Sequence, residues 1–472
     1  MKRYEALAAD VAASIANGTL KPGDRLPSVR QAGSSWHVSA ATVFQAYYLL
    51  EAKGMIRARD RSGYYVADGI KVLPPEPETI SQPDGEARPV VISELVLGIL
   101  ESAMSRDVVP LGSAFPSPVL FPLDRLGRAT AMAVKHIDPW ATVNDLAPGS
   151  NALRQQIALR YMIDGVQVGA DQIIVTNGAM EALNLCLTAV CTPGDTVLVE
   201  SPCFYACLQA LERLGLHAVE VPTDPREGID LQALEAAIIR HSPSACWVMT
   251  NFQNPLGASM PESKKRALVE LISRYRIPLV EDDVYGELYY DNRRPVPTKA
   301  FDTEGWVMHC GSFSKTLAPG YRVGWTSPGR FLRAVTYQKL TTSLATSLPA
   351  QAGIARYLQR GSYERHLRGL RLALRKARDQ YIEVISCCFP PATRVSRPTG
   401  GYFLWVELPG AVDALTLHRN AMKARISVAP GPMFSASRGF ASCVRINYGH
   451  PLNARNEGAL QELGRLALRL AK

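Results

Sequence analysis

The first 68 residues carry the hydrophobic spacing of short helices followed by a β-hairpin. A first helix is predicted by apolar side chains that recur every three or four residues, at Tyr4, Leu7, Val11 and Ile15. Ser28 and Gln31 form a capping box that predicts the start of a second helix, and Ser39 caps a third. Residues 56–59 and 64–66 alternate like two short strands around a turn.

The rest of the chain changes character twice. Residues 69–110 begin with the Pro-rich stretch 73–78. Chains of this composition tend to remain extended, so we expect residues 69–110 to be a linker. From residue 111 onward, short apolar runs alternate with amphipathic helical patterns, which predicts an α/β fold. The expected organisation is a first domain at 1–68, a linker at 69–110 and a larger domain at 111–472.

Three helices followed by a hairpin are typical of a winged helix-turn-helix, whose third helix enters the major groove of double-stranded DNA. Residues 1–68 hold nine Lys plus Arg against six Asp plus Glu, which suits such a partner. The residues expected to contact DNA are Arg25, Arg30, Ser39, Thr42, Gln45, Arg61 and Gly63. The alternative is a small helical adaptor domain with solvated arginines.

Composition narrows the class of protein. A chain of 472 residues is longer than a single hydrophobic core usually supports, so we expect more than one domain. The net charge of +9 is compatible with a nucleic-acid partner but is not specific to one. None of the nine cysteines falls in a CxxC spacing, so we expect reduced thiols and no metal site. We find no signal peptide and no apolar run of about 18 residues, so we expect a cytoplasmic protein with no membrane partner.

In the larger domain, polar clusters follow five apolar strands. They include Asn254 after the third strand, Asp282 after the fourth and Lys315 after the fifth. Asn254 and Asp282 are 28 residues apart, and Asp282 and Lys315 are 33 apart. Each gap is close to one βα repeat of about 30 residues, so these groups should meet at one edge of the sheet.

The clustered residue types suit one ligand. Free amides at Gly178 and Ala179, at the start of a helix, can hold a phosphate. Ser312, Ser314 and Arg322 add hydroxyls and a fixed positive charge. Phe204 offers a flat apolar face, although the adjacent Tyr205 is a rival, and Asp282 offers a carboxylate. Lys315 supplies an amine able to form a Schiff base, so the set describes pyridoxal 5'-phosphate.

The first domain closely resembles the GntR family of winged helices. The residues that carry the resemblance are Tyr4, the run from Leu20 to Arg30, Val38, Ser39, Thr42, Val43, Ala46, Tyr47, Leu50, Glu51 and Gly54. One position departs from the pattern. Ala40 stands where the family usually carries an arginine just after the serine of the recognition helix, so a DNA contact of that family is missing.

The larger domain resembles a fold-type-I aminotransferase, with a large and a small domain, and the fusion resembles the MocR subfamily of GntR regulators. The motifs that carry this are Asn254-Pro255-Leu256-Gly257, Asp282-x-x-Tyr285, Ser312-x-Ser314-Lys315 and Arg322. The resemblance implies that Lys315 forms the Schiff base, Asp282 keeps the pyridine nitrogen protonated, and Asn254 and Tyr285 bond the phenolic oxygen. It also implies that Arg445 binds a substrate or effector carboxylate, with a plain ion pair as the alternative.

The same resemblance implies a homodimer whose sites are shared between subunits. Asn144 stands where catalytic relatives commonly place a tyrosine, so the partner's contribution is open. Three functions remain: a transcription regulator that senses an amine or amino acid through Lys315, an active aminotransferase with an auxiliary DNA-binding head, or a sensor of the cofactor itself. We favour the regulator, since a plain enzyme has no need of a DNA-binding head, and we leave enzymatic activity undecided.

Overall fold

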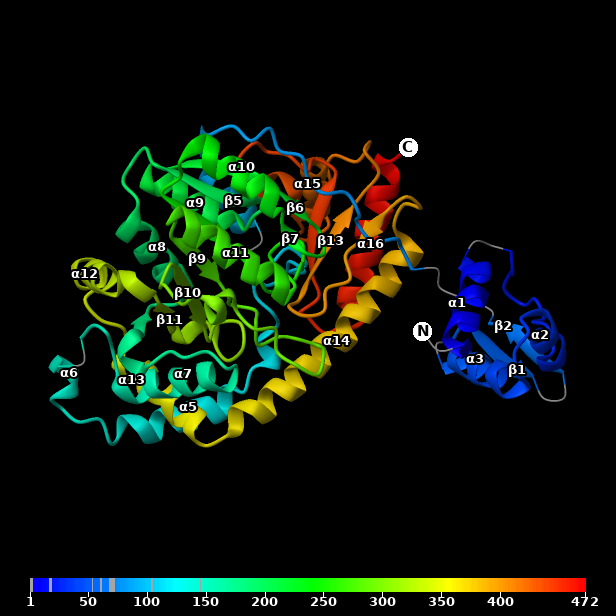
Figure 1. The fold of residues 1–472 in the computed structure, drawn as a ribbon, viewed down its shortest axis with the longest axis horizontal. Helices are drawn as coiled ribbons and strands as arrows, with labels where there is room; N and C mark the ends of the chain where they lie inside the picture. Colours follow the sequence, from blue (N-terminus) through cyan, green and yellow to red (C-terminus); the bar gives the residue numbers. More distant parts are fainter. Residues whose placement is uncertain are drawn as a thin grey trace. The chain divides into compact units, whose positions relative to one another are not determined.

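The computed structural model describes residues 3–16, 19–52, 54–59, 62–67, 73–102, 105–144 and 146–472. The chain divides into two compact units, residues 1–73 and 74–472. The first unit contains the helices α1 (Arg3–Ala16), α2 (Val29–Ser35) and α3 (Ala40–Ala52), followed by the strands β1 (Ile56–Arg59) and β2 (Gly63–Val66) (Figure 1). The two strands pair antiparallel, with Ile56 opposite Val66. The predicted order of three helices and a hairpin is confirmed.

Local signals account for most of this first unit. The Ser28 side chain accepts a hydrogen bond from the backbone of Gln31, whose own side chain bonds back to Ser28, so the capping box at α2 is present. The Ser39 hydroxyl accepts from the Thr42 amide at the start of α3. The helices then bury one apolar face each in a common core that includes Leu7, Val11, Ile15, Val43, Tyr47 and Leu50.

The second unit is built on a nine-stranded sheet with the strand order β3-β6-β5-β8-β9-β10-β11-β4, in which β7 also pairs with β6. The bounds are β3 (Arg88–Pro89), β4 (Ile174–Thr176), β5 (Thr196–Ser201), β6 (His217–Asp224), β7 (Gly228–Ile229), β8 (Ala245–Val248), β9 (Leu279–Asp282), β10 (Val307–Ser312) and β11 (Gly324–Ser327). Strands β6, β5, β8, β9 and β10 are parallel to their neighbours in that series, whereas β11 is antiparallel to both β10 and β4.

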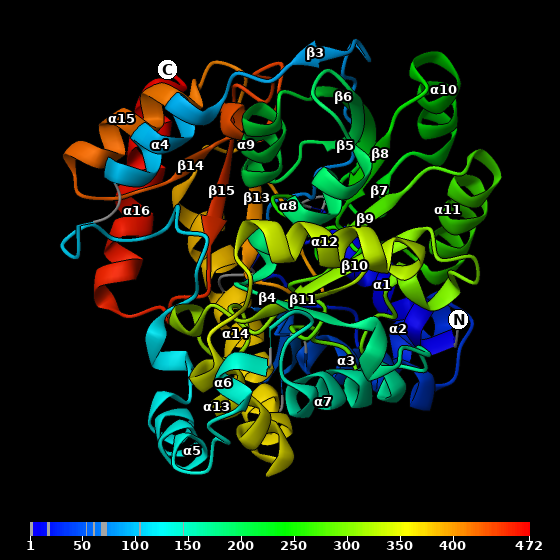
Figure 2. The same cartoon turned by 90° about the vertical axis from the view of Figure 1, so that its left-hand side faces the viewer.

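Helices cover both faces of this sheet (Figure 2). Along β5, Val197 and Val199 pack into a cluster with α8 (Ala179–Val190) and α9 (Tyr205–Leu214). The intervening Leu198 points to the other face, where it packs with α10 (Leu231–His241) and α11 (Glu262–Tyr275). Because both faces are buried, these strands read as continuous apolar runs rather than as alternating ones.

A smaller antiparallel sheet completes the second unit, with the order β12-β13-β15-β14. Its strands are β12 (Arg394–Val395), β13 (Phe403–Glu407), β14 (Ala429–Pro430) and β15 (Cys443–Asn447), and its helices are α14 (Ser362–Cys388), α15 (Ala414–Lys423) and α16 (Ala454–Leu470). The long α14 runs from beside α13 (Leu348–Gln359) to α16 (Figure 1). The predicted α/β fold with a large and a small domain is confirmed.

The remaining helices lie at the start of the second unit and next to α8. They are α4 (Ser93–Ser102), α5 (Leu123–Val134), α6 (Ala141–Asn144), α7 (Asn151–Ile163) and α12 (Leu332–Thr342). No helix among the described residues is both long and apolar enough to cross a membrane.

Much of the segment that we expected to be a linker lies along the second unit. The Pro75 carbonyl accepts from the Val395 amide at 2.9 Å, and Ser81 and Thr223 exchange two hydrogen bonds. Strand β3 then joins the edge of the large sheet beside β6. The Glu212 carboxylate accepts from the amide of Ser93, where α4 begins. A Pro-rich segment is short of donors, but its carbonyls bond well to a neighbouring domain, which explains the difference.

Candidate functional site

A cavity of about 180 Å³ lies at the carboxyl ends of the large sheet's strands and is lined by many of the predicted residues, although Gly178, Asn254 and Arg445 are not among its lining. Asp282 ends β9, Ser312 ends β10, and Lys315 follows in the next turn. The residues that line the cavity include Ala179, Phe204, Tyr205, Asp282, Tyr285, Ser312, Ser314, Lys315 and Arg322, together with Ala114 and Phe115. Asp282 and Lys315, which strand spacing predicted to meet, therefore line one cavity, and Asn254 lies beside it in contact with Tyr285.

One end of this cavity is a cluster of hydroxyls and a guanidinium at the start of α8. The Ser312 hydroxyl donates to the Ser314 hydroxyl at 2.9 Å, and Arg322 donates to the Asn177 carbonyl at 3.1 Å. Gly178 has a φ of 84°, and a side chain there would collide with the Arg322 guanidinium. Glycine is therefore required where the backbone turns into the helix. The Gly178 amide already donates to the Thr176 carbonyl at 2.9 Å, so the amides at the start of α8 that suit an anion begin at Ala179, which lines the cavity.

At the centre of the cavity, Asp282 and Lys315 occupy a poorly solvated environment. Burial, reinforced by the neighbouring Asp283 carboxylate, raises the pKa of Asp282 to about 7, although the Lys315 charge opposes the shift. Burial together with the charge of Arg445 lowers the pKa of Lys315 to about 7. The Asp282 Oδ1 atom has no hydrogen-bond partner among the described residues. A lysine whose pKa is lowered is more often neutral, and the neutral amine is the form that attacks a carbonyl carbon.

Arg445 lies on β15 of the small domain, is fully buried, and contacts the cavity's Tyr285 through Asn254. Its guanidinium donates to Asn254 Oδ1 at 3.0 Å and to the carbonyl of Gly112 at 2.7 Å. The ring of Phe403 lies 4.2 Å from its central carbon. The partners of Arg445 in the described chain are uncharged, and its Nε atom has none. The ion pair that would explain this arginine structurally is therefore not seen there.

Asn254 and Tyr285 lie side by side, with Asn254 Nδ2 at 3.5 Å from the Tyr285 hydroxyl. Burial raises the pKa of Tyr285 well above its ordinary value, so it acts as a neutral donor. Phe204 and Tyr205 both reach the cavity with ring centroids 4.8 Å apart, so both remain candidates to stack on a bound ring.

Sequence reasoning missed the segment 112–115, which covers the site. The Ala114 carbonyl accepts from Lys315 Nζ at 2.9 Å, and the Phe115 ring lies 3.9 Å from the same nitrogen. One contact uses a backbone carbonyl and the other an aromatic ring, both about 200 residues from Lys315 in sequence, and no motif indicates either of them.

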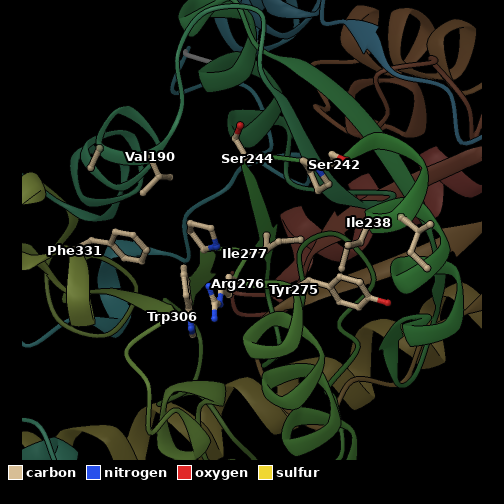
Figure 3. Close-up of a pocket in the computed structure, with 13 residues that line it drawn as sticks. Val190, Ile238, Ser242, Ser244, Tyr275, Arg276, Ile277, Trp306 and Phe331 are labelled. Atoms are coloured by element: carbon tan, nitrogen blue, oxygen red, sulfur yellow. The ribbon is translucent and has the colours of Figure 1, made fainter.

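A larger cavity of about 700 Å³ lies at the opposite, amino ends of the strands, beside Trp306 and Phe331 (Figure 3). Arg276 is the only charged residue among the described residues that line it. The described residues that line this larger cavity therefore include no carboxylate and no lysine, whereas the smaller cavity holds Asp282 and Lys315.

The residues expected to contact DNA gather at two places on the first unit. Ser39 and Thr42 lie at the start of α3 with their hydroxyls 2.9 Å apart, and Gln45 is exposed one turn later. The exposed Arg25 lies against Gly63 of the hairpin, where a Cβ would be 3.6 Å from its guanidinium. Arg30 is exposed on α2, and Arg61 lies outside the described residues.

Comparison with known proteins matches both units. Residues 3–66 match the model of the bacterial regulatory proteins of the gntR family, and residues 146–462 match the model of aminotransferase class I and II. The chain is 43% identical over 472 residues to the HTH-type transcriptional regulator YdcR of Escherichia coli, covering 99% of each chain. It is 39% identical over 471 residues to the regulator YjiR of the same organism, again covering 99% of each.

Among solved structures, the second unit is similar to the kynurenine aminotransferase of Pyrococcus horikoshii, which was solved in complex with PMP. The TM-score is 0.74 at 29% identity, and the match covers 80% of this chain and 95% of that one. Since the relatives match from end to end and the two family models divide the chain between them, the chain belongs to the MocR subfamily of GntR regulators, in which a winged helix-turn-helix precedes a domain of the class I and II aminotransferase family.

Proposed function

We propose that the protein is a transcription regulator that binds a DNA operator through its first unit and senses an amine or amino acid in the cavity around Lys315. The observation that carries the sensing half is that two buried polar atoms of the site, Asp282 Oδ1 at the centre of that cavity and Arg445 Nε on β15, have no hydrogen-bond partner among the described residues. Buried polar groups without partners are rare and unfavourable, so they indicate a missing ligand.

The residues present fit pyridoxal phosphate. Asp282 would accept a hydrogen bond from the pyridine nitrogen, and Gly178, Ala179, Ser312, Ser314 and Arg322 would hold the phosphate. Asn254 and Tyr285 would bond the phenolic oxygen, and Phe204 or Tyr205 would lie on the ring. When bound, the cofactor supplies an aldehyde carbon for which the Lys315 amine and an effector's amine compete.

Arg445 narrows the effector to compounds that also carry a carboxylate. Its guanidinium already bonds the Gly112 and Ser113 carbonyls, which are weaker acceptors than a carboxylate. A carboxylate that takes their place would release the segment 112–115 from Arg445. The ligand could change the packing of the second unit in this way, provided that its affinity differs between the arrangement with the segment bonded to Arg445 and the arrangement with the segment released.

A homodimer would place two winged helices on a two-half-site operator. Four large exposed apolar side chains in the stretch of chain that precedes α7 support this assembly, because a partner subunit could cover them. They are Phe115, Val119, Trp140 and Val143.

The test is titration of labelled duplexes from the intergenic region beside the gene with the purified full-length protein, with and without candidate amino acids. We expect sequence-specific binding whose affinity changes when an amino acid alters the cofactor's absorbance. Lys315→Ala should keep DNA binding and lose that response. Absence of specific binding would refute the regulator.

A second candidate function, transamination, is favoured by the presence of Asp282 and Lys315 in one cavity, with Arg445 near enough for its charge to act on Lys315. Steady transfer of an amino group to a keto acid at ordinary enzyme rates would support it. DNA binding that follows cofactor occupancy with no amine present would instead indicate a sensor of the cofactor.

A further inference from the structure

The recognition helix α3 is almost without charge. Its 13 residues, AATVFQAYYLLEA, include one charged side chain, Glu51. Glu51 Oε1 accepts from the Ala58 amide of the hairpin at 2.9 Å, so this carboxylate contacts the wing. Any base readout by α3 must therefore use neutral side chains.

The exposed residues of α3 form a stripe opposite its buried face. Val43, Ala46, Tyr47 and Leu50 are buried, and the stripe consists of Ala40, Ala41, Phe44, Gln45 and Tyr48. Phe44 is 52% exposed and Tyr48 is 74% exposed, which is unusual for large rings on a small domain. The hydroxyl of the neighbouring Thr42 already bonds Ser39. The side-chain amide of Gln45 is therefore the group on this face that we expect to bond a base edge.

These side chains match one kind of base pair. Guanine is read mainly by arginine or lysine, which the stripe does not contain. Adenine is read by glutamine or asparagine through its N6 and N7 atoms, and the thymine methyl is the apolar group of the major groove. The basic residues expected to contact DNA, Arg25 and Arg30, are exposed but lie off the stripe, so they are not part of the readout by α3. Where such side chains contact phosphates, they position the protein and carry no sequence information.

We propose that α3 reads A·T pairs, with Phe44 and the alanine methyls packing on thymine methyl groups and Gln45 bonding adenine. The inference rests on the proposed function, since it requires that the first unit binds an operator. It makes Phe44 a specificity-determining residue, a role that the hydrophobic pattern of the sequence gave no reason to expect. It also gives Ala40 a positive role, because a small apolar side chain there lets the helix approach a methyl group.

The test begins with selection of binding sites from a random double-stranded DNA library by the full-length protein. Each thymine of the selected half-site is then replaced by deoxyuridine, which keeps every hydrogen-bonding group and removes only the methyl. For wild type, we expect about a fourfold loss of affinity for each contacted methyl, the effect of removing one buried methyl group.

Phe44→Ala should bind the thymine and uracil duplexes equally at the position that Phe44 contacts, whereas Phe44→Leu should keep part of the preference. Because Phe44 is exposed, neither change should disturb folding, which circular dichroism checks. Arg30→Ala serves as a matched control, because it should weaken binding to both duplexes and leave their ratio unchanged.

Selection of G·C-rich half-sites, or indifference of the wild type to uracil at every position, would overturn this inference and leave the proposed function standing. A thymine preference that survives in Phe44→Ala would overturn the role of Phe44. Failure to select any sequence would refute the proposed function and this inference with it.

Discussion

Replacing Asp282 with asparagine should stabilise the cofactor-free protein and weaken cofactor binding. The Asp282 carboxyl is buried, and its Oδ1 atom has no partner among the described residues. Its pKa rises from 3.8 to about 7 in the folded state. At pH 8 the ionised group therefore destabilises the fold by about 4 kcal/mol. An asparagine avoids the charge but leaves an amide in need of partners, which costs about 1–3 kcal/mol. The net gain should be about 1–3 kcal/mol.

The pH dependence of this gain has a definite sign. A carboxyl whose folded pKa is raised contributes its stability fully below its unfolded pKa, and loses it as pH rises through the folded pKa of about 7. The penalty of the wild type should therefore shrink to below about 2 kcal/mol at pH 5. Denaturant unfolding of the second unit in the cofactor-free protein, at pH 5 and pH 8, measures the difference in free energy of unfolding between the variant and the wild type. A variant less stable than wild type at pH 8, or a larger gain at pH 5, would refute the reasoning.

The adjacent Asp283 provides a matched control. It is equally buried, but its carboxylate accepts from Asn251 and His309 and pairs with Arg294. Asp283→Asn should therefore destabilise the protein at both pH values, because it leaves a buried cation underpaired. Cofactor affinity should fall about 10-fold or more in Asp282→Asn, the effect of losing a hydrogen bond to a charged group.

Three further variants test the site and the DNA-binding face. Lys315→Ala should abolish the visible absorbance of the protein-linked cofactor, and a persistent band would assign the anchor to another amine. Gly324→Ala should weaken cofactor binding in an equilibrium titration, because its Cβ would lie 2.6 Å from the Gly178 backbone, whereas a Cβ at Gly320 meets nothing within 4 Å, so Gly320→Ala should bind normally. Arg445→Gln should raise the amino-acid concentration needed to change the cofactor spectrum by at least about 30-fold, with a much smaller effect on an amine that lacks a carboxylate.

The parts of the fold that follow from local rules were predictable from sequence. The capping box at Ser28 acts within four residues, so its pattern is sufficient evidence for the start of α2. The gathering of Asp282 and Lys315 was also predictable, because each follows a strand and parallel strands end at one edge of the sheet. These predictions rest on the fixed residue spacings of helix caps and of βα repeats.

Long-range backbone contacts were not predictable in the same way. The Pro75 carbonyl bonds the Val395 amide, and the Ala114 carbonyl bonds Lys315 Nζ. Every residue has a carbonyl, so sequence carries no sign of which one is used. Phe44 was not among the residues expected to contact DNA, because a phenylalanine is more often found in a core, yet it is 52% exposed.

The geometry of the cavity alone does not separate a regulator from an aminotransferase, because Lys315, Asp282 and Arg445 suit either role. The distinction lies in what happens to the segment 112–115, which bonds both Lys315 and Arg445. If a ligand's carboxylate displaces this segment, as proposed above, an enzyme would have to release and restore it in every turnover, whereas a sensor needs only two arrangements of the segment that its ligand populates differently. A ligand that shifts DNA affinity tenfold must bind one arrangement at least tenfold more tightly, about 1.4 kcal/mol. Exchanging two backbone carbonyls for one carboxylate on a buried arginine is large enough to supply that difference, since charge-assisted hydrogen bonds are about twice as strong as neutral ones.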